Sequence, residues 1–430
     1  MSNGATVKFE KICILGLGYI GLPTASAFAT HNVKVVGVDV NEHVVETLQA
    51  GKIHIHEPGL GEAVRQAIES GNLSVATTPQ AADAFLIAVP TPFYDDKRAD
   101  MRAVTSAAEA IVPHLRPGNL VVLESTSPPR TTVDLLVPIL EKSGLKAGAD
   151  FHVAYSPERV LPGQILRELI ENARVIGGIT PQSAQAGSDL YATFVKGEII
   201  QTDATTAEMV KLMENTYRDV NIAIANEFAR LADRFGVDVW EAISLANRHP
   251  RVKILNPGPG VGGHCISVDP WFFVEAAPDL AKLIRQARQV NDSQPHFVVD
   301  LVREILGELR GKKIAALGLA YKPDVDDLRE SPAAEIVHLL QNEGAAVKAF
   351  EPFKPAAGLA AIEAVPTLQD ALAEADLVLL LVSHTQFRTL TPDQLAALTP
   401  CRLLVDTVGG WSGPAWAAAG FDLHKLGVRK

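Results

Sequence analysis

The stretch GPGVGGHCISVDP, residues 258–270, places a thiol, Cys265, shortly after a run of glycines. Glycines at this density predict a backbone that turns sharply or comes close to a ligand. The thiol could be a nucleophile, a metal ligand or a buried core residue. A metal site is disfavoured, because His264 and Cys265 have no second ligand pair at a suitable spacing. Asp269 is close enough in sequence to assist proton transfers at a reacting thiol.

A second pair of polar residues stands on a stretch with helical periodicity. Lys211 and Asn215 are four residues apart and therefore share one helix face. A lysine and an amide that face a pocket could polarise a hydroxyl group or stabilise an oxyanion. The alternative is an ordinary solvated helix face, and the spacing alone leaves both open.

A glycine fingerprint near the amino terminus points to a dinucleotide. Gly16, Gly18 and Gly21 follow the apolar run KICIL at 11–15 and open a helical stretch at 22–31, which is the context that this fingerprint requires. Asp39 ends the next strand, 21 residues after Gly18. A carboxylate there can accept a hydrogen bond from a ribose 2′-hydroxyl and would repel a 2′-phosphate. We therefore predict NAD, rather than NADP, as the cofactor.

A thiol beside a nicotinamide would allow an alcohol to be oxidised as far as an acid. Hydride can leave an alcohol carbon directly, but an aldehyde must first gain a nucleophile. A thiolate would form a thiohemiacetal, whose oxidation gives a thioester that water hydrolyses. The other two cysteines, Cys13 and Cys401, lie in apolar strand patterns, where we expect core residues.

Several elements must position these groups. Segments 83–92, 120–126 and 151–157 predict further buried parallel strands, each ending in polar or turn residues, where such sheets bind ligands. Residues 205–235 contain no Gly or Pro and predict a helix of roughly 45 Å, with Thr205 or Thr206 as its N-cap. After Gly311 a looser copy of the amino-terminal unit follows, at 312–323, 345–352 and 375–384.

The predicted fold class is therefore α/β: two Rossmann-like doubly wound domains joined by a central all-helical domain with a long connecting helix. A chain of 430 residues is long enough for two or three domains. We assign residues 1–204 to an NAD-binding domain and residues 205–305 to the helical domain, which carries Lys211 and Cys265. Residues 306–430 form the second Rossmann-like domain.

Composition excludes several classes of protein. The formal net charge of −11 argues against nucleic acid as a partner, which needs a basic surface. Three widely spaced cysteines do not form a disulfide framework and fit a reducing, cytoplasmic setting. The uncharged stretch 12–29 is interrupted by glycines and follows Glu10 and Lys11, so we expect neither a signal peptide nor membrane insertion.

Eight motifs, in order along nearly the whole chain, resemble the UDP-glucose/GDP-mannose 6-dehydrogenase family, the nucleotide-sugar 6-dehydrogenases. They are GLGYIGLP, VDVNE, EPGL, VPTP, SPERVLPG, AEMVKLMEN, GPGVGGHCISVDP and YKPDVDDLRES. Members of this family oxidise C6 of a UDP-sugar to a carboxylate with two NAD. The resemblance implies an amino-terminal NAD domain, a central helical region that forms a homodimer, and a carboxy-terminal domain that binds UDP.

The resemblance also implies roles for individual residues. Cys265 matches the family's nucleophile. The other catalytic positions are Lys211 for the oxyanion, Asn215 and Asp269 for positioning water and Lys211, Glu158 for activating water and Thr126 for holding it. The cofactor contacts carried over are Gly16, Gly18, Tyr19, Ile20, Gly21, Asp39, Thr91, Ser125 and Arg329. The substrate contacts are Arg159, Val160, Lys211, Asn215, Arg251, Gly262 and Lys322, and Arg251 is expected to reach the site of a neighbouring subunit. No metal is implied.

Two departures from the family pattern concern the sugar. Glucose-oxidising relatives often carry a second carboxylate where this chain has Pro162, and a lysine where it has Val268. Residues 247–273 are most similar to members that oxidise UDP-N-acetyl-D-mannosamine for bacterial surface polysaccharides. UDP-N-acetylglucosamine is the second expectation and UDP-glucose the third.

Two other functions are compatible with parts of the pattern. A two-electron hydroxyacid dehydrogenase can also combine a Rossmann domain, a long helix and a Lys/Asn pair, but Cys265 and the second α/β domain argue against it. An NAD-dependent sensor or scaffold with a relic site would not need the complete set of cysteine, lysine, asparagine and aspartate.

Overall fold

The computed structural model describes residues 9–55, 57–161, 163–354, 362–411 and 413–429. The chain divides into two units, 1–214 with 275–278 and 215–274 with 279–430. The boundary at residues 214 and 215 falls within one long helix, α8 (Ala204–Phe235). Among the described residues, no helix combines the length and the apolar character needed to cross a membrane.

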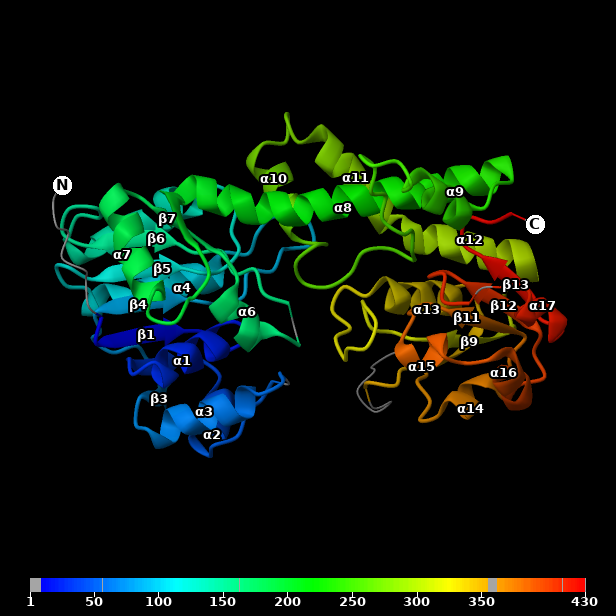
Figure 1. Ribbon diagram of the computed structural model, residues 1–430, viewed down its shortest axis with the longest axis horizontal. Coiled ribbons are helices and arrows are strands. Elements are labelled where there is room, and N and C mark those ends of the chain that lie inside the picture. The colour runs from blue at the N-terminus through cyan, green and yellow to red at the C-terminus, as the bar shows by residue number, and fades with distance from the viewer. Residues whose placement is uncertain (1–8, 56, 162, 355–361, 412, 430) are drawn as a thin grey trace. The chain divides into compact units, whose positions relative to one another are not determined.

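The first unit is built on a sheet whose described strands have the order β3-β2-β1-β4-β5-β6-β7-β8 (Figure 1). In a central strand of this sheet, alternate residues enter two different cores, because successive side chains point to opposite faces. Ile12 and Ile14 of β1 belong to the core that includes Phe28 of α1, whereas Cys13 and Leu15 belong to the opposite core. The strands are β1 (Lys11–Leu15), β2 (Lys34–Val38), β3 (Leu73–Ala76), β4 (Ala84–Ile87), β5 (Leu120–Leu123), β6 (His152–Tyr155), β7 (Arg174–Gly178) and β8 (Ile199–Asp203).

Both faces of this sheet carry helices, as a buried parallel sheet requires. The strands predicted at 11–15, 83–92, 120–126 and 151–157 are confirmed, and their neighbours pair in parallel from β3 to β6. The helices are α1 (Gly21–Thr30), α2 (Glu42–Gln49), α3 (Leu60–Glu69), α4 (Arg102–Ile111), α5 (Val137–Leu140), α6 (Ile165–Glu171) and α7 (Pro181–Tyr191), with 3₁₀ turns at Val112–His114 and Glu141–Ser143 and a π turn at Thr132–Leu136.

The sheet departs from an all-parallel pattern at β7, which the sequence analysis did not predict. β7 pairs antiparallel with β6, through Ala154 with Gly178 and Tyr155 with Gly177. β8 then pairs in parallel with β7. Because β7 runs in the opposite direction to β6, its first residue, Arg174, lies at the edge where β5 and β6 end.

The long helix is confirmed, with its start one residue earlier than predicted, at Ala204. The prediction that Thr205 or Thr206 caps it is wrong. Asp203 provides the cap instead: its Oδ1 accepts a hydrogen bond from the backbone N–H of Thr206 at 2.9 Å. Aspartate is among the strongest N-cap residues, since a carboxylate accepts the unpaired N–H groups of the first turn.

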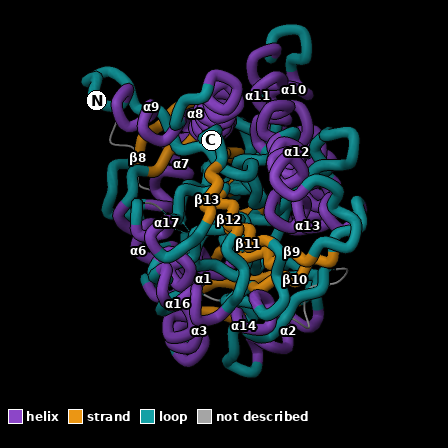
Figure 2. Tube along the Cα trace, turned by 90° about the vertical axis from the view of Figure 1, so that its right-hand side faces the viewer, coloured by secondary structure: helices purple, strands orange, loops and turns teal. Residues whose placement is uncertain are grey.

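The second unit contains a parallel sheet, which confirms the predicted repeat. Figure 2 shows its described strands in the order β10-β9-β11-β12-β13. Ile314 and Ala316 enter a core with Val298 of α12, whereas Ala315 and Leu317 enter a core with Trp411. The strands are β9 (Lys313–Leu317), β10 (Ala346–Phe350), β11 (Leu377–Leu380), β12 (Leu403–Asp406) and β13 (Asp422–Lys425). The helices are α9 (Val239–Ala246), α10 (Asp269–Ala276, whose last two residues belong to the first unit), α11 (Lys282–Asp292), α12 (Gln294–Leu306), α13 (Pro332–Asn342), α14 (Leu368–Leu372), α15 (Thr385–Arg388), α16 (Pro392–Leu398) and α17 (Ala415–Ala418).

In both sheets, a carboxylate that follows the second strand accepts a backbone N–H from the turn after the first strand. In the first unit, Asp39 Oδ2 accepts the backbone N–H of Leu17, in the glycine turn, at 3.0 Å. In the second unit, Glu351 Oε2 accepts the backbone N–H of Leu319 at 2.7 Å. The Glu351 carboxylate is also bonded to Nε2 of His384, 3.1 Å away, and neither of these two side chains is exposed.

Candidate active site

The glycine turn between β1 and α1 has the features that a dinucleotide requires. Gly16 has φ +93°, and a Cβ there would lie 2.5 Å from the carbonyl oxygen of Ala88. A Cβ on Gly21 would lie 1.8 Å from the carbonyl oxygen of Gly16. These two glycines are thus needed for packing within the chain. Gly18 differs, since its Cβ would meet nothing within 4 Å. The backbone at Gly18 is open to a ligand such as a pyrophosphate.

Two further groups beside this turn fit NAD. Asp39 accepts backbone N–H groups from Leu17 at 3.0 Å and Asn41 at 2.9 Å, and each carboxylate oxygen keeps a lone pair for a ribose hydroxyl. Ile20 precedes α1 and provides no side-chain cap, and the positive end of the helix dipole therefore faces the glycine turn. Tyr19, beside it, is half-buried. The residues present therefore fit NAD, whose diphosphate would lie at α1.

Three hydroxyl residues connect the ends of β4 and β5. The Thr91 hydroxyl donates a hydrogen bond to the carbonyl oxygen of Thr126 at 2.6 Å. The Ser125 hydroxyl donates to the carbonyl oxygen of Val89 at 2.7 Å. The structure thus brings Thr91, Ser125 and Thr126 together at the carboxyl edge of the sheet, where open α/β sheets bind their ligands.

Glu158 follows β6 at the same edge and is buried. Its Oε1 accepts the backbone N–H groups of Arg159 at 2.6 Å and Val160 at 2.9 Å, so the carboxylate fixes its own loop. Its Oε2 forms an ion pair with Arg174 Nη2 at 3.0 Å. The Arg159 side chain is directed elsewhere, since its Nη1 binds Glu214 Oε1 at 2.8 Å.

In the second unit, the glycines before Cys265 are explained by packing within the chain. A Cβ on Gly262 would lie 2.4 Å from the carbonyl oxygen of Glu330, and a Cβ on Gly263 would lie 2.7 Å from the ring of Tyr321. Gly263 also has φ +84°, which strains any other residue. The backbone N–H of Gly263 donates to the carbonyl oxygen of Arg329 at 3.0 Å. The YKPDVDDLRES segment thus packs directly on the cysteine loop.

Cys265 is held one turn away from a buried pair of polar residues. The backbone N–H of Asp269 donates to the carbonyl oxygen of Cys265 at 2.8 Å. Asn215 Nδ2 donates to Asp269 Oδ2 at 2.6 Å, and both side chains are buried. Lys211 is also buried, one helical turn before Asn215 on α8. Neither residue lies on a solvated helix face, the alternative that the spacing left open.

The three cysteines have different surroundings. Cys13 is fully buried in β1, and burial raises the pKa of its thiol to about 11. Cys401 is buried just before β12, not within a strand, and burial likewise raises the pKa of its thiol. Cys265 is half-buried. A thiol with a raised pKa stays protonated and is a poor nucleophile, so the structure separates Cys265 from two core cysteines.

The remaining residues expected at the site lie in loops of the second unit. Arg329 is half exposed and pairs with Asp327, its Nη2 lying 2.6 Å from Oδ2. Lys322 Nζ lies 5.6 Å from the centre of the Tyr321 ring. Arg251 is exposed in the turn after α9. Of the two departures from the family pattern, Val268 is buried beside Asp269, and Pro162 lies outside the described residues.

The sequence analysis missed the charged groups behind Glu158. Arg174 and Glu124 are buried beside it, together with Tyr191. Arginine and glutamate at the ends of apolar strands are a usable signal, since such residues are almost never fully buried unless they are paired. Neither their pairing nor the reversed direction of β7 could be read from spacing.

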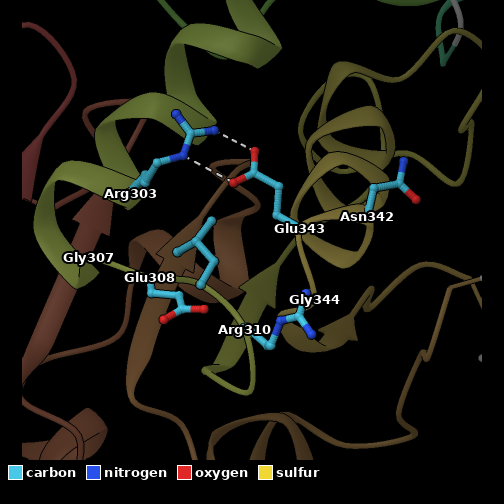
Figure 3. Close-up of a pocket in the computed structure, with 8 residues that line it drawn as sticks. Arg303, Gly307, Glu308, Arg310, Asn342, Glu343 and Gly344 are labelled. Atoms are coloured by element: carbon cyan, nitrogen blue, oxygen red, sulfur yellow. Dashed lines mark hydrogen bonds and ion pairs between the residues drawn. The ribbon is translucent and has the colours of Figure 1, made fainter.

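A pocket of about 490 Å³ in the second unit contains none of the residues predicted for the site (Figure 3). In it, Arg303 and Glu343 form a two-point ion pair, with Nε of Arg303 3.1 Å from Oε2 of Glu343. The described residues contain no group of three or more His, Cys, Asp or Glu side chains that could hold a metal ion.

Three family models match the chain. The NAD-binding domain of the UDP-glucose/GDP-mannose dehydrogenase family matches residues 10–195, its central domain 205–293 and its UDP-binding domain 315–412. The chain is 50% identical over 428 residues to an NDP-N-acetyl-D-galactosaminuronic acid dehydrogenase of Ralstonia solanacearum, covering 97% of this chain and 100% of the relative. It is 50% identical over 426 residues to the UDP-N-acetyl-D-mannosamine dehydrogenase of Yersinia pestis, covering 94% and 100%.

A solved structure also matches this chain over nearly its whole length. The UDP-D-ManNAc dehydrogenase of Pyrococcus horikoshii superposes with a TM-score of 0.90 at 39% identity, covering 97% of this chain and 99% of that one. The fold, the NAD turn and these matches agree. The chain belongs to the UDP-glucose/GDP-mannose dehydrogenase family and is an NAD-dependent UDP-sugar dehydrogenase.

Proposed function

We propose that this enzyme oxidises UDP-N-acetyl-D-mannosamine at C6 to UDP-N-acetyl-D-mannosaminuronate, removing four electrons through covalent intermediates on Cys265. The observation that carries the proposal is the connection between Cys265 and the buried Asn215–Asp269 pair. The thiol is half-buried rather than in a core, and the Asp269 backbone binds the Cys265 carbonyl at 2.8 Å. The nucleophile and Asp269 therefore lie on one short segment, and Asn215 of α8 binds the carboxylate of that segment.

NAD, when bound, would accept one hydride in each of two oxidations. In the first, the C6 hydroxyl loses its proton and the C6 carbon its hydride, which leaves an aldehyde. The Cys265 thiolate then adds to the aldehyde carbon, and the resulting oxyanion takes up a proton to give a thiohemiacetal. Lys211 would stabilise the oxyanion, because a buried ammonium group interacts strongly with developing negative charge.

Loss of the second hydride from C6 and of the hydroxyl proton gives a thioester. Water then attacks the acyl carbon, the carbon–sulfur bond breaks and the sulfur leaves as the thiolate. In this step Glu158 would take the proton from water, with Thr126 holding the water, and Asn215 and Asp269 would keep Lys211 and a water in place. The products are a carboxylate and the regenerated thiolate.

The choice of sugar is supported by residues 247–273 and by the relatives. The relative from Yersinia pestis and the structure from Pyrococcus horikoshii carry names that specify N-acetyl-D-mannosamine. The relative from Ralstonia solanacearum carries a name that specifies N-acetyl-D-galactosaminuronic acid. Both names specify an N-acetyl sugar, so a galacto-configured N-acetyl sugar nucleotide is the second candidate. The uronic acid would be used in a bacterial surface polysaccharide.

A homodimer is also proposed, and an apolar stripe on α8 supports it. Tyr217, Ile224, Phe228, Leu231 and Phe235 are 40% exposed or more and recur at helical spacing. A stripe of this kind on a helix fits a second copy of the chain rather than water. Arg251, exposed after α9, would then reach the substrate of the partner.

The domain boundaries at residues 204 and 305 and a cytoplasmic location remain parts of this proposal. Three free cysteines, two of them buried, suit a reducing compartment. Arg329, and likewise Gly262 and Lys322, are proposed as ligand contacts on the basis of the motifs around them.

Counting NADH tests the proposal directly. With UDP-N-acetyl-D-mannosamine, we expect two NADH for each sugar consumed and a uronic acid as product, while the galacto, N-acetylglucosamine and glucose nucleotides react at least about tenfold more slowly in kcat/KM. Cys265→Ser should form no acid, whereas Cys401→Ala, in a core, should keep two NADH per sugar. One NADH per sugar in the wild-type enzyme would exclude the thioester route.

A further inference from the structure

An arginine buried in the first unit stands between two carboxylates. Arg174 is 5% exposed, and its Nη2 lies 3.0 Å from Glu158 Oε2. Its Nη1 donates to the hydroxyl oxygen of Ser156 at 2.8 Å and lies 3.5 Å from Glu124 Oε1. The planar guanidinium group thus directs one nitrogen to each side, which a lysine could not do.

The topology of the sheet explains why this arginine reaches Glu158. Glu124 and Glu158 follow β5 and β6, so both lie at the edge where those strands end. Arg174 begins β7, which runs antiparallel to β6, and so it comes to the same edge from the opposite direction. A parallel β7 would have placed its first residue at the far edge of the sheet.

Tyr191, at the end of α7, holds the arginine from another side. The guanidinium carbon of Arg174 lies 4.3 Å from the centre of the Tyr191 ring. The Tyr191 hydroxyl donates a hydrogen bond to Glu124 Oε1 at 2.5 Å. Among the described residues, no donor bonds the other oxygen of Glu124, Oε2. In the part of the chain that the structure describes, Tyr191 and Arg174 are thus the side chains that bind the buried Glu124 carboxyl group.

The charges of this cluster favour Glu158 as the partner of Arg174. Burial, followed in importance by the ion pair with Arg174 and repulsion from Glu158, leaves the pKa of Glu124 raised to about 7. Around neutral pH the single cation is therefore shared with a carboxyl group that is partly protonated. Glu158 has backbone N–H donors as well as Arg174, and so it is the better stabilised anion.

We infer that Arg174 is a positioning residue: it keeps Glu158 ionised and directed toward the water that this carboxylate activates, while Tyr191 and Glu124 fix the arginine itself. The inference rests on the proposed role of Glu158 in hydrolysis of the thioester. Arg174 contacts neither substrate nor water in this account, and acts through Glu158.

The test follows acyl-enzyme hydrolysis in the full-length protein with NAD and UDP-N-acetyl-D-mannosamine. Mass spectrometry of quenched samples measures the acyl adduct on Cys265, and the hydrolysis rate is recorded against pH. Arg174→Met removes the positive charge that lies 3.0 Å from Glu158 Oε2, so hydrolysis should slow about tenfold or more, and the acid limb of the pH–rate profile should move to higher pH. The adduct should accumulate, with little change in KM.

Controls separate this inference from the proposed function. Glu158→Gln should itself accumulate the adduct. If it does not, the role of Glu158 fails, whatever Arg174 does. Arg303→Met removes an exposed arginine that is also paired with a glutamate, and it should leave the pH profile unchanged. If Glu158→Gln accumulates the adduct while a folded Arg174→Met shows an unshifted acid limb and no adduct, the inference is overturned.

A conservative variant covers the case in which Arg174→Met does not fold. Arg174→Lys keeps the charge but has one nitrogen in place of the two that bond Ser156 and Glu158, so it cannot reproduce the geometry of both bonds. Hydrolysis should therefore slow by about threefold or more while the acid limb stays near its wild-type position. A wild-type hydrolysis rate in Arg174→Lys would show that the guanidinium geometry does not matter, and would also overturn the inference.

Discussion

Asn215 Nδ2 donates a hydrogen bond to Asp269 Oδ2 at 2.6 Å, and this bond joins the long helix α8 to the first turn of α10. The two residues are 54 positions apart in the chain and both are buried. The amide can donate but never carries charge, so it fixes the carboxylate without neutralising it. This bond connects the helix that carries Lys211 to the segment that carries Cys265.

Asn215→Leu removes the amide that donates to Asp269 Oδ2, so this hydrogen bond is lost. We expect a loss of about 1–3 kcal/mol in stability, because a buried acceptor loses its hydrogen bond, and a fall in kcat of about 100-fold. Urea unfolding and NADH formation measure the two effects. Asn221→Leu is the control: its amide, on the same helix, makes an exposed hydrogen bond to the carbonyl oxygen of Tyr217. Equal kcat values for the two variants would contradict the prediction.

Alkylation should distinguish the three thiols. Iodoacetamide reacts with thiolates, and the raised pKa values of Cys13 and Cys401 keep these buried groups protonated. We therefore expect a single label on the native protein, at Cys265, and three labels in urea. Peptide mapping by mass spectrometry gives the positions. Labelling of Cys401 as fast as Cys265 would show that burial does not control reactivity here.

Asp39→Asn should weaken the discrimination between NAD and NADP. The asparagine oxygen can still accept the Leu17 N–H, but the negative charge that would repel a 2′-phosphate is gone. We expect the ratio of kcat/KM for NAD to that for NADP to fall by about tenfold or more. Asp83→Asn is a matched control, since Asp83 accepts the backbone N–H groups of Glu10 and Lys11 at 2.9 Å in the same way. That variant should keep the wild-type ratio.

Gly263→Ala should reduce activity through the Tyr321 ring. Gly236 provides the comparison, because it also has a positive φ, +70°, but its Cβ would meet nothing within 4 Å. Both alanine variants should lose about 1 kcal/mol from backbone strain. Only Gly263→Ala should also displace the cysteine loop and lower kcat, by about tenfold or more. Thermal unfolding and NADH formation separate the two effects, and equal activities would exclude the ring contact as the cause.

The raised pKa of Glu124 makes stability depend on pH. Its folded value of about 7 exceeds the ordinary 4.5, so the folded state binds more protons between these pH values. The free energy of unfolding should therefore fall as pH rises through this window, by roughly 1–3 kcal/mol. Glu124→Gln lacks this term, so its stability relative to wild type should increase from about pH 5 to about pH 8. Glu109→Gln, at an exposed position, is the control for urea unfolding at both pH values.

The sequence predicted those parts of the fold that depend on local pattern. Continuous apolar runs predicted β1, β4 and β5, and the absence of Gly and Pro predicted α8, because each of these signals lies within one segment. β7 was missed, since RVIGG combines a charge with two glycines and only its pairing with β6 reveals a strand. The predicted N-cap of α8, Thr205 or Thr206, lies two or three residues inside the helix from the observed cap, Asp203.

The site was predicted only in part, because contacts between distant segments leave no local signal in the sequence. The glycines at 262 and 263 predicted a backbone that turns sharply or comes close to a ligand. In the structure this backbone instead packs against Tyr321 and Glu330 of the same chain. Asn215 and Asp269 were both predicted as site residues, but their hydrogen bond was not, because 54 positions separate them in the chain. The position of Arg174 beside Glu158 could not be predicted without knowing that β7 runs antiparallel to β6.

Glu351, which follows β10, limits how the carboxy-terminal sheet could bind a dinucleotide. Oε2 of Glu351 already has three partners in the chain, the backbone N–H groups of Leu319 and Ala320 and Nε2 of His384, whereas Oε1 accepts the backbone N–H of Phe353. Its counterpart, Asp39, keeps room for an outside hydroxyl. Because His384 and two backbone N–H groups already bind Oε2 of Glu351, this carboxylate is less open than Asp39 to the ribose hydroxyl of a dinucleotide.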